Sequence, residues 1–214
     1  MDFEFASEIE QGAMLPLFPL PLVMFPDCCL PLQIFEARYL DLVKRCMKND
    51  SEFGIVTQRK TPAPAIVDAI LPVGCSVKIT DFNAQPNGLL GIQCTGMARF
   101  EAGAVQTASN GLVVAKVSKL QQEAIQPLDD SLHELVAVLE SLTCHEFART
   151  LGYAEHFDAR PWMADASRLS FHLSYLLPFS TAEKYRLLEC DTATERLTII
   201  SQRLDQIRDE VAQN

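Results

Sequence analysis

The chain has 214 residues, of which 48% are hydrophobic and 21% charged, enough to bury the core of one large domain or two small ones. Its formal net charge is −10. Both halves are acidic, with 10 Lys and Arg against 13 Asp and Glu in residues 1–124, and 8 against 15 in the remainder. This balance disfavours binding to nucleic-acid phosphates or to an anionic membrane surface, because both attract positive charge.

The first residues and the cysteines indicate a reduced, cytoplasmic protein. Asp2 and Glu4 stand where a secretory signal would carry basic residues. The seven cysteines are odd in number and scattered, which is more typical of buried thiols than of disulfides. No apolar run approaches the roughly 20 residues that cross a bilayer. We therefore expect cytoplasmic localisation, no membrane contact and a flexible N-terminus over residues 1–13.

The first predicted elements are short extended segments. Five prolines, at positions 16, 19, 21, 26 and 31, fall within residues 14–32. Proline cannot donate to a β ladder and disrupts a helix interior, so it argues here against both a helix and a central strand. The stretch is therefore predicted to form edge strands joined by fixed turns.

A helix is predicted next, over residues 36–48. Its apolar residues Tyr39, Val43, Cys46 and Met47 are spaced i, i+4, i+7 and i+8, so they fall on one face. Basic residues occupy its last turns, where they suit the negative end of the helix dipole. We expect this helix to close one end of a barrel.

Several short β-branched and apolar runs predict that barrel. They cover residues 53–57, 65–73, 77–82, 89–94, 98–105 and 112–117. Asn87 and Gly88 separate two of these runs and favour a hairpin turn, because both residues readily adopt positive φ angles. Short strands at such close intervals are typical of a barrel or a strongly coiled sheet, which we place at residues 14–122.

The remainder, residues 123–214, is predicted to be a helical bundle. Three capping boxes mark helix starts, and each pairs a hydroxyl with a Glu three residues later: Ser131 with Glu134, Ser180 with Glu183, and Thr192 with Glu195. A further helix over residues 165–177 is expected to end at Pro178. The apolar residues of the last helix recur three and four apart and predict a narrow buried stripe: Leu197, Ile200, Leu204, Ile207 and Val211.

The sequence contains no recognisable catalytic or metal-binding motif. It lacks the G-x-x-x-x-G-K-[ST] loop that surrounds ATP phosphates. Residues 74–78 come within one residue of the nucleophile turn G-x-S-x-G, but Lys78 replaces its second glycine, so Ser76 is interpreted as a strand residue. Neither His133 nor His145 belongs to the His-Glu-x-x-His pattern of zinc peptidases. We expect no catalytic residue, no metal and no cofactor.

A longer motif resembles the N-terminal domain of Lon proteases. It comprises Leu-Phe-Pro-Leu at 17–20, Phe-Pro at 25–26, Leu-Gln-Ile-Phe-Glu-Ala-Arg-Tyr at 32–39 and Phe-Gly-Ile-Val at 53–56. Gly-Met-Ala-Arg-Phe at 96–100 matches a further element of the same family, and the resemblance extends over residues 14–208.

The resemblance implies an α+β fold: a PUA-like pseudo-β-barrel with one inserted helix, followed by a C-terminal α-helical bundle. It also implies a module that recognises protein substrates, without the ATPase and the Ser-Lys peptidase that follow this region in Lon. We therefore interpret the chain as a free-standing, non-catalytic domain, similar to part of an ATP-dependent protease. Its expected partners are proteins or unfolded polypeptides.

Four residues of the motif are candidate binding residues: Glu36, Arg38, Tyr39 and Arg99. Glu36 and Arg38 stand at a strand-to-helix junction, where they form a structural ion pair, which we favour, or face a groove. Arg99 has the same two alternatives. Two other functions stay open beside protein binding: an enzyme with a dispersed site, and an RNA-binding PUA-like module, which the acidic charge disfavours.

Overall fold

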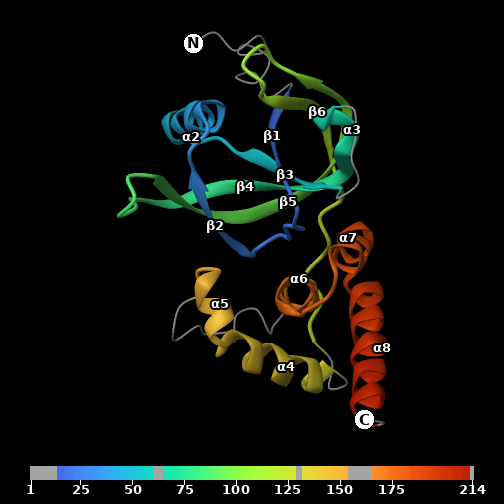
Figure 1. Cartoon of the computed structure of the whole chain (residues 1–214). Coiled ribbons are helices and arrows are strands. Elements are labelled where there is room, and N and C mark those ends of the chain that lie inside the picture. Colours follow the sequence, from blue (N-terminus) through green and yellow to red (C-terminus); the bar gives the residue numbers. More distant parts are fainter. Residues whose placement is uncertain (1–13, 60–64, 129–131, 154–164, 213–214) are drawn as a thin grey trace. The chain divides into compact units, whose positions relative to one another are not determined.

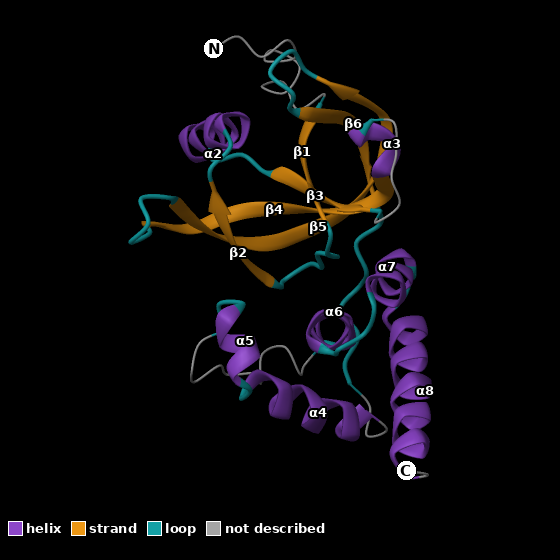
Figure 2. Ribbon diagram, viewed as in Figure 1, coloured by secondary structure: helices purple, strands orange, loops and turns teal. Residues whose placement is uncertain are grey.

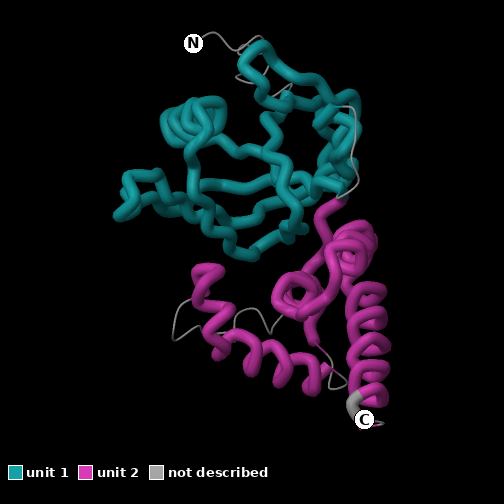
Figure 3. The backbone as a smooth tube through the Cα atoms, in the orientation of Figure 1, with its two compact units in different colours: residues 1–120 teal, residues 121–214 magenta. Residues whose placement is uncertain are grey.

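The computed structural model describes residues 14–59, 65–128, 132–153 and 165–212. The chain divides into two compact units, a strand unit, Met1–Leu120, and a helical unit, Gln121–Asn214 (Figure 3). The division falls close to the predicted boundary between residues 122 and 123. The predicted flexible terminus, residues 1–13, lies outside the described residues.

The two units differ in secondary structure (Figures 1 and 2). The strand unit contains β1 (Leu15–Leu20), β2 (Cys29–Ile34), α2 (Ala37–Asn49), β3 (Phe53–Gln58), α3 (Ile66–Ala69), β4 (Ile70–Ala84), β5 (Leu90–Thr107) and β6 (Val113–Lys119). The helical unit contains α4 (His133–Thr143), α5 (Glu146–Thr150), α6 (Ala166–Leu176), α7 (Thr181–Glu189) and α8 (Ala193–Ala212). The α+β class predicted from the sequence is confirmed.

The strands form a mixed sheet that closes on itself. Their order is β2-β5-β4-β3-β1-β6, and a further pairing of β5 with β6 joins five of them in a ring. β1 runs parallel to β3, and the other pairings are antiparallel. β5 pairs with β2 over residues 90–95 and with β6 over residues 100–107. The second half of β5 therefore closes the ring, and its first half carries β2, the strand outside the ring.

Two strands are longer than predicted. The runs at 89–94 and 98–105 belong to the single strand β5, and the run at 77–82 belongs to β4, which starts at Ile70. Register shifts between Cys75 and Val77 and between Ile79 and Asp81 bend β4 without ending it. The predicted strand at 65–73 is wrong in its first half, because residues 66–69 form the short helix α3. The predicted hairpin turn is confirmed, with Gly88 at φ 78°.

The proline-rich strands have two different positions in the sheet. β2 pairs only with β5 and is an edge strand, as predicted. β1 lies between β3 and β6, so its prediction as an edge strand is wrong. β1 pairs with β6 over residues 15–17 and with β3 over residues 17–20. Pro16 is therefore paired only with β6, and Pro19 only with β3. The nitrogen of each proline can face the side without a partner strand, so no hydrogen bond of the sheet need be lost.

The interior of the ring is organised around Phe100. Its aromatic ring lies against the backbone of two glycines on neighbouring strands: a Cβ added at Gly54 would approach Phe100 to 2.7 Å, and one at Gly74 to 2.6 Å. Leu17, Val113 and other buried residues complete this core. The Arg-Phe element of the sequence motif thus supplies the central core side chain of the ring.

Helix α2 packs one face against the strands. Tyr39, Leu42, Val43 and Cys46 are buried, which confirms most of the predicted stripe. Met47 was predicted to be buried as well, but it is 41% exposed. The apolar face of α2 is therefore rotated toward Leu42, and Met47 lies at its border.

The helical unit has α6 at its centre, in contact with α4, α7 and α8. Every residue of α6 except Arg168 is buried, so the helix is covered on all sides and not on one face alone. The hydroxyls of Ser170 and Ser174 donate to carbonyls of the preceding turn, each at 2.7 Å, which satisfies polar groups inside this core. The helix ends before Pro178, as predicted.

The predicted helix starts are confirmed in part. Ser180 and Glu183 form the full capping box of α7. At the start of α8, the Thr192 hydroxyl accepts a bond from the Glu195 amide at 3.2 Å. Ser131 lies outside the described residues, and α4 begins at His133. The short helix α5 was not predicted.

Candidate functional site

Three of the four candidate binding residues lie together at the start of α2. Glu36 is the N-cap residue, and its carboxylate forms a 2.7 Å ion pair with Arg38. A second nitrogen of Arg38 donates to the carbonyl of Gly111, also at 2.7 Å. Arg38 thus connects the start of α2 to the turn between β5 and β6. These contacts match the structural ion pair that we favoured from the sequence.

Tyr39 continues this cluster into the core. Its ring stacks on Phe18, with centroids 3.8 Å apart and an interplanar angle of 13°, and the Arg38 guanidinium lies 4.7 Å from the centroid of the Tyr39 ring. Burial raises the pKa of the Tyr39 hydroxyl. Tyr39 is 5% exposed, so little of it is accessible to a ligand.

Arg99, the fourth candidate residue, belongs to a different element from the other three. It lies on β5, opposite Cys75 of β4 in the antiparallel pairing of these strands, and it is 6% exposed. Its carbonyl accepts a bond from the amide of Leu120, at the end of the strand unit. Like Tyr39, Arg99 is largely buried.

The described residues lack a metal-binding cluster, and two of their buried cysteines are poor nucleophiles. The part of the chain that the structure describes holds no group of three or more His, Cys, Asp or Glu suited to a metal ion. Burial raises the pKa of Cys46 to about 11 and that of Cys94 to about 12, so both thiols stay protonated near neutral pH. Within the described ranges, no helix is long and apolar enough to cross a membrane.

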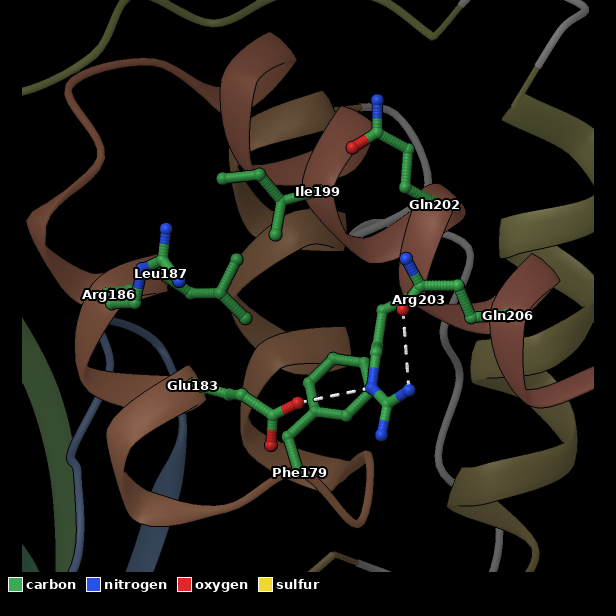
Figure 4. A pocket seen from close by; sticks show the side chains of 8 residues that line it. All are labelled: Phe179, Glu183, Arg186, Leu187, Ile199, Gln202, Arg203 and Gln206. Atoms are coloured by element: carbon green, nitrogen blue, oxygen red, sulfur yellow. Dashed lines mark hydrogen bonds and ion pairs between the residues drawn. The ribbon is translucent and has the colours of Figure 1, made fainter. Parts of the chain in front are cut away.

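A groove in the helical unit lies between α7 and α8 (Figure 4). We call it the α7–α8 groove; its volume is about 360 Å³. Eight residues line it: Phe179, Glu183, Arg186, Leu187, Ile199, Gln202, Arg203 and Gln206. Phe179, Leu187 and Ile199 supply an apolar floor, and charged and amide side chains surround it.

A smaller hollow in the strand unit lies between the end of α2 and β4. We call it the α2–β4 hollow; its volume is about 220 Å³. Met47 and Phe82 line it and are 41% and 58% exposed. Lys78 and Asp50 form a 2.9 Å ion pair at the same hollow. Two large apolar side chains beside a charged pair make a surface on which an apolar segment can pack.

Sequence reasoning did not identify these two surfaces. Met47 was assigned to the core, and Phe82 was the last residue of a predicted strand. Ile199 fell outside the predicted stripe of the last helix, and its position off that stripe was the available signal for an exposed apolar residue.

Comparison with known proteins gives a consistent result. A family model described as the substrate-binding domain of ATP-dependent protease La (LON) matches residues 14–206. A Lon protease of Cytophaga hutchinsonii is 31% identical over 205 residues, which are 92% of this chain and 24% of that protein. A Lon protease of Azospirillum brasilense is 28% identical over 204 residues, 89% of this chain and 24% of that protein. The chain spans about a quarter of the length of these curated relatives.

Two solved structures have a similar fold. The crystal structure of a Lon N-terminal domain protein from Xanthomonas campestris matches with a TM-score of 0.69 and 29% identity, over 90% of this chain and 97% of that chain. The N-terminal domain of a Mycobacterium avium complex Lon protease matches with a TM-score of 0.58 and 19% identity, over 87% and 95%. The second match, at this low identity, concerns the fold alone.

Proposed function

The chain belongs to the family of Lon substrate-binding domains, and from this premise we propose that it is a non-catalytic module that binds polypeptide. The family description names substrate binding, and the substrates of a protease are proteins. The family membership also agrees with the motif recognised in the sequence at residues 17–20, 25–26, 32–39 and 53–56.

The observation that carries this proposal is the exposure of Met47 and Phe82 at the α2–β4 hollow. Side chains of this size are usually buried, and the exposure of two of them around one hollow is a feature of binding surfaces. A flexible Met beside an aromatic ring can adapt to different apolar side chains, which suits a module that accepts many clients.

We propose no catalytic activity for the chain. The match to the curated relatives covers about a quarter of their length and corresponds to a substrate-binding region. The printed sequence lacks the phosphate-binding loop of an ATPase. The proteolytic activity named for the relatives is therefore not extended to this chain.

A binding role for Glu36, Arg38, Tyr39 and Arg99 stays a prediction. Their contacts support a framework role, in which they hold the start of α2 against the ring. Part of the Arg38 and Glu36 side chains remains accessible, 28% and 42%, so these two retain some capacity to meet a ligand. We also keep as proposals that the ring is PUA-like, that the helices form a bundle and that the protein is cytoplasmic.

A binding assay with a permanently unfolded protein tests the proposed function. Fluorescence anisotropy with labelled, reduced and carboxymethylated α-lactalbumin should show binding, and folded α-lactalbumin should show none. The double variant Met47→Ser/Phe82→Ser should weaken binding by about tenfold or more, since each removed side chain contributes on the order of 1 kcal/mol. Met97→Ser is the matched control, because Met97 is 44% exposed but does not line the α2–β4 hollow.

Equal affinity for the folded and unfolded forms would argue against the proposal. A labelled single-stranded RNA at low salt provides a further arm. Binding of that RNA in preference to the unfolded protein would favour the RNA-binding alternative instead.

A further inference from the structure

We propose that the α7–α8 groove is a second polypeptide site, which takes a segment with a large apolar side chain flanked by Asp or Glu. The proposal rests on the proposed function in that both ligands are polypeptides, but it concerns a different unit and a different chemistry. It is argued from the lining of the groove and from the charges that remain available there (Figure 4).

The size and floor of the groove suit side chains of a peptide. Its volume of about 360 Å³ is near the lower end of the range for ligand pockets, roughly 300–1,000 Å³, so it has room for a few side chains. Leu187 is 1% exposed and forms the base, and Ile199 is 36% exposed at the side. An apolar side chain placed on them would cover Ile199.

The negative charge of the groove is already engaged within the protein. One oxygen of Glu183 accepts bonds from the amide and hydroxyl of Ser180, and the other accepts from Arg203 at 3.1 Å. These bonds, those from Ser180 first, lower the pKa of Glu183. Glu183 therefore caps α7 and fixes the position of Arg203. Both of its oxygens already accept hydrogen bonds, so it has little capacity to accept one from a ligand.

The positive charge of the groove is only partly engaged. Arg186, one turn after Glu183 on α7, is exposed, and among the described residues no carboxylate lies within 4.0 Å of its guanidinium. Arg203 is held in place by Glu183, with Gln206 3.4 Å and Glu210 3.7 Å from its Nη1. A ligand carboxylate could meet the guanidinium of Arg186 without displacing an ion pair formed by the described residues.

The groove differs from the other two hollows in the charged residues that line it. Its lining carries Arg186 and Arg203 against Glu183, and Glu210 lies 3.7 Å from Arg203, so Arg186 is the cation of the groove that no described carboxylate pairs. The lining of the α2–β4 hollow has Lys78 against two aspartates, and a third hollow beside α8 has one Asp and no basic residue. Of these three surfaces, the α7–α8 groove alone complements an anionic ligand.

The amides at the rim favour a peptide over a simple apolar anion. Gln202 and Gln206 are exposed and stand one turn apart on α8. The carboxamide of Gln202 can both donate to and accept from a peptide backbone, and that of Gln206, whose oxygen accepts from Arg203 at 3.4 Å, can still donate. The groove thus combines an apolar floor, a cationic edge and amides that match an acidic, apolar peptide.

Three short peptides test this inference. Each is acetylated, amidated and labelled with fluorescein: Glu-Glu-Leu-Phe-Glu-Glu, Lys-Lys-Leu-Phe-Lys-Lys and Glu-Glu-Ser-Ser-Glu-Glu. Fluorescence anisotropy at low salt should show binding of the acidic apolar peptide in preference to the other two. Amidation removes the terminal carboxylate, so binding must depend on the side chains.

Two variants locate the site. Arg186→Glu should weaken binding of the acidic apolar peptide by about tenfold, because it replaces an attraction by a repulsion. Ile199→Ser should weaken the same binding without reversing the charge preference. Lys116→Glu is the control for Arg186→Glu: it makes the same change in net charge on an exposed residue of β6 and should leave binding unchanged. Circular dichroism confirms that each variant is folded.

Two results would overturn the inference: equal binding of the acidic and basic peptides to the unaltered chain, or equal effects of Arg186→Glu and Lys116→Glu. The unfolded protein used above is measured in parallel. If it binds and the acidic peptide does not, the α7–α8 site fails while the proposed function stands; if neither binds, both fail.

Discussion

Arg196 lies with 0% of its surface exposed in the helical unit, where it meets four neighbours. Its guanidinium donates to the hydroxyl of Ser170 at 2.9 Å, to the carbonyl of Cys190 at 3.0 Å and to the carboxylate of Glu123 at 2.6 Å. It also lies 4.0 Å from the centroid of the Phe171 ring. One side chain therefore joins α8 to α6, to the end of α7 and to the segment that precedes α4.

Replacement of Arg196 should destabilise the protein strongly. Arg196→Ala leaves the carboxylate of Glu123 without its buried partner, so we expect a loss of about 3–5 kcal/mol in the free energy of unfolding. Arg196→Lys keeps the charge but not the fork of donors and should lose less. Urea denaturation measures both. Arg208→Ala, at an exposed ion pair with Glu134, should change stability by less than about 1 kcal/mol. A similar loss for Arg196→Ala and Arg208→Ala would contradict this assignment.

His172 should make the stability dependent on pH. It is buried in α6, and its Nδ1 lies 2.8 Å from the Tyr153 hydroxyl. Burial first, and the charge of Arg168 second, lower the pKa of His172 from 6.5 to about 3. The unfolded chain therefore binds a proton that the folded chain does not bind between these two values. The stabilisation is complete above pH 6.5 and is lost as the pH falls toward 3.

Urea denaturation at several pH values checks this expectation. The free energy of unfolding should fall by up to about 1.4 kcal/mol per pH unit below pH 6.5, in addition to the contribution of the carboxylates. His172→Gln, which keeps a polar partner for Tyr153 but does not titrate, should remove this slope. His145→Gln, at an exposed position, is the control. A slope unchanged in His172→Gln would show that another group is responsible.

At the scale of elements, the ring depends on close packing between its strands. Gly54→Ala places a Cβ 2.7 Å from both Leu17 and Phe100, which is too close for carbon atoms. Such overpacking should cost about 1–3 kcal/mol in thermal or urea unfolding. Because the obstacle is a side chain, Gly54→Ala/Phe100→Leu should lose less than the sum of its single variants. Gly103→Ala, in an exposed part of β5 where the nearest atom is 3.3 Å away, should lose less stability than Gly54→Ala. Additive losses in the double variant would refute the proposed contact.

The elements that local sequence patterns define were predicted well. The stripe of Tyr39, Val43 and Cys46 located α2, Ser180 and Glu183 marked the start of α7, and Asn87-Gly88 marked the hairpin between β4 and β5. Each of these signals lies within a few residues and acts through the local backbone. The continuity of β4 and β5 was missed because a bulge and a strand end look alike in the hydrophobic pattern.

Features that depend on distant segments could not be predicted in the same way. The interior position of β1 depends on a partner on each side, one of them β6. The burial of α6 on all sides depends on α4, α7 and α8 together. Local periodicity reports which face of a helix is apolar, and it does not report how many neighbours cover the helix.

At the scale of the whole molecule, the candidate site shows the same limit. Three of the candidate residues, Glu36, Arg38 and Tyr39, are neighbours in the sequence and were expected to lie together. Arg99 became a candidate only because it belongs to a further motif of the same family. The exposure of Met47 and Phe82 depends on how far α2 extends over β4, and the α7–α8 groove depends on how two helices pack. These are tertiary properties, so no single segment carries their signal.

The chain as a whole should bind without catalysis. In a coupled assay, purified protein should hydrolyse ATP at the rate of the buffer, because the sequence lacks the phosphate-binding loop. Fluorescent casein should remain intact, because the family match concerns a substrate-binding region. An activity that co-elutes with the protein through gel filtration and a second affinity step would refute this expectation.

The position of β1 has a consequence for biosynthesis. Leu15 pairs with Ala115 of β6, so β1 leaves the ribosome well before β6 and must wait for it before the ring can close. During that interval an apolar segment remains open to wrong partners. Pro16 and Pro19 interrupt the row of donors that an intruding chain would need, and so they protect the nascent strand until its own neighbours arrive.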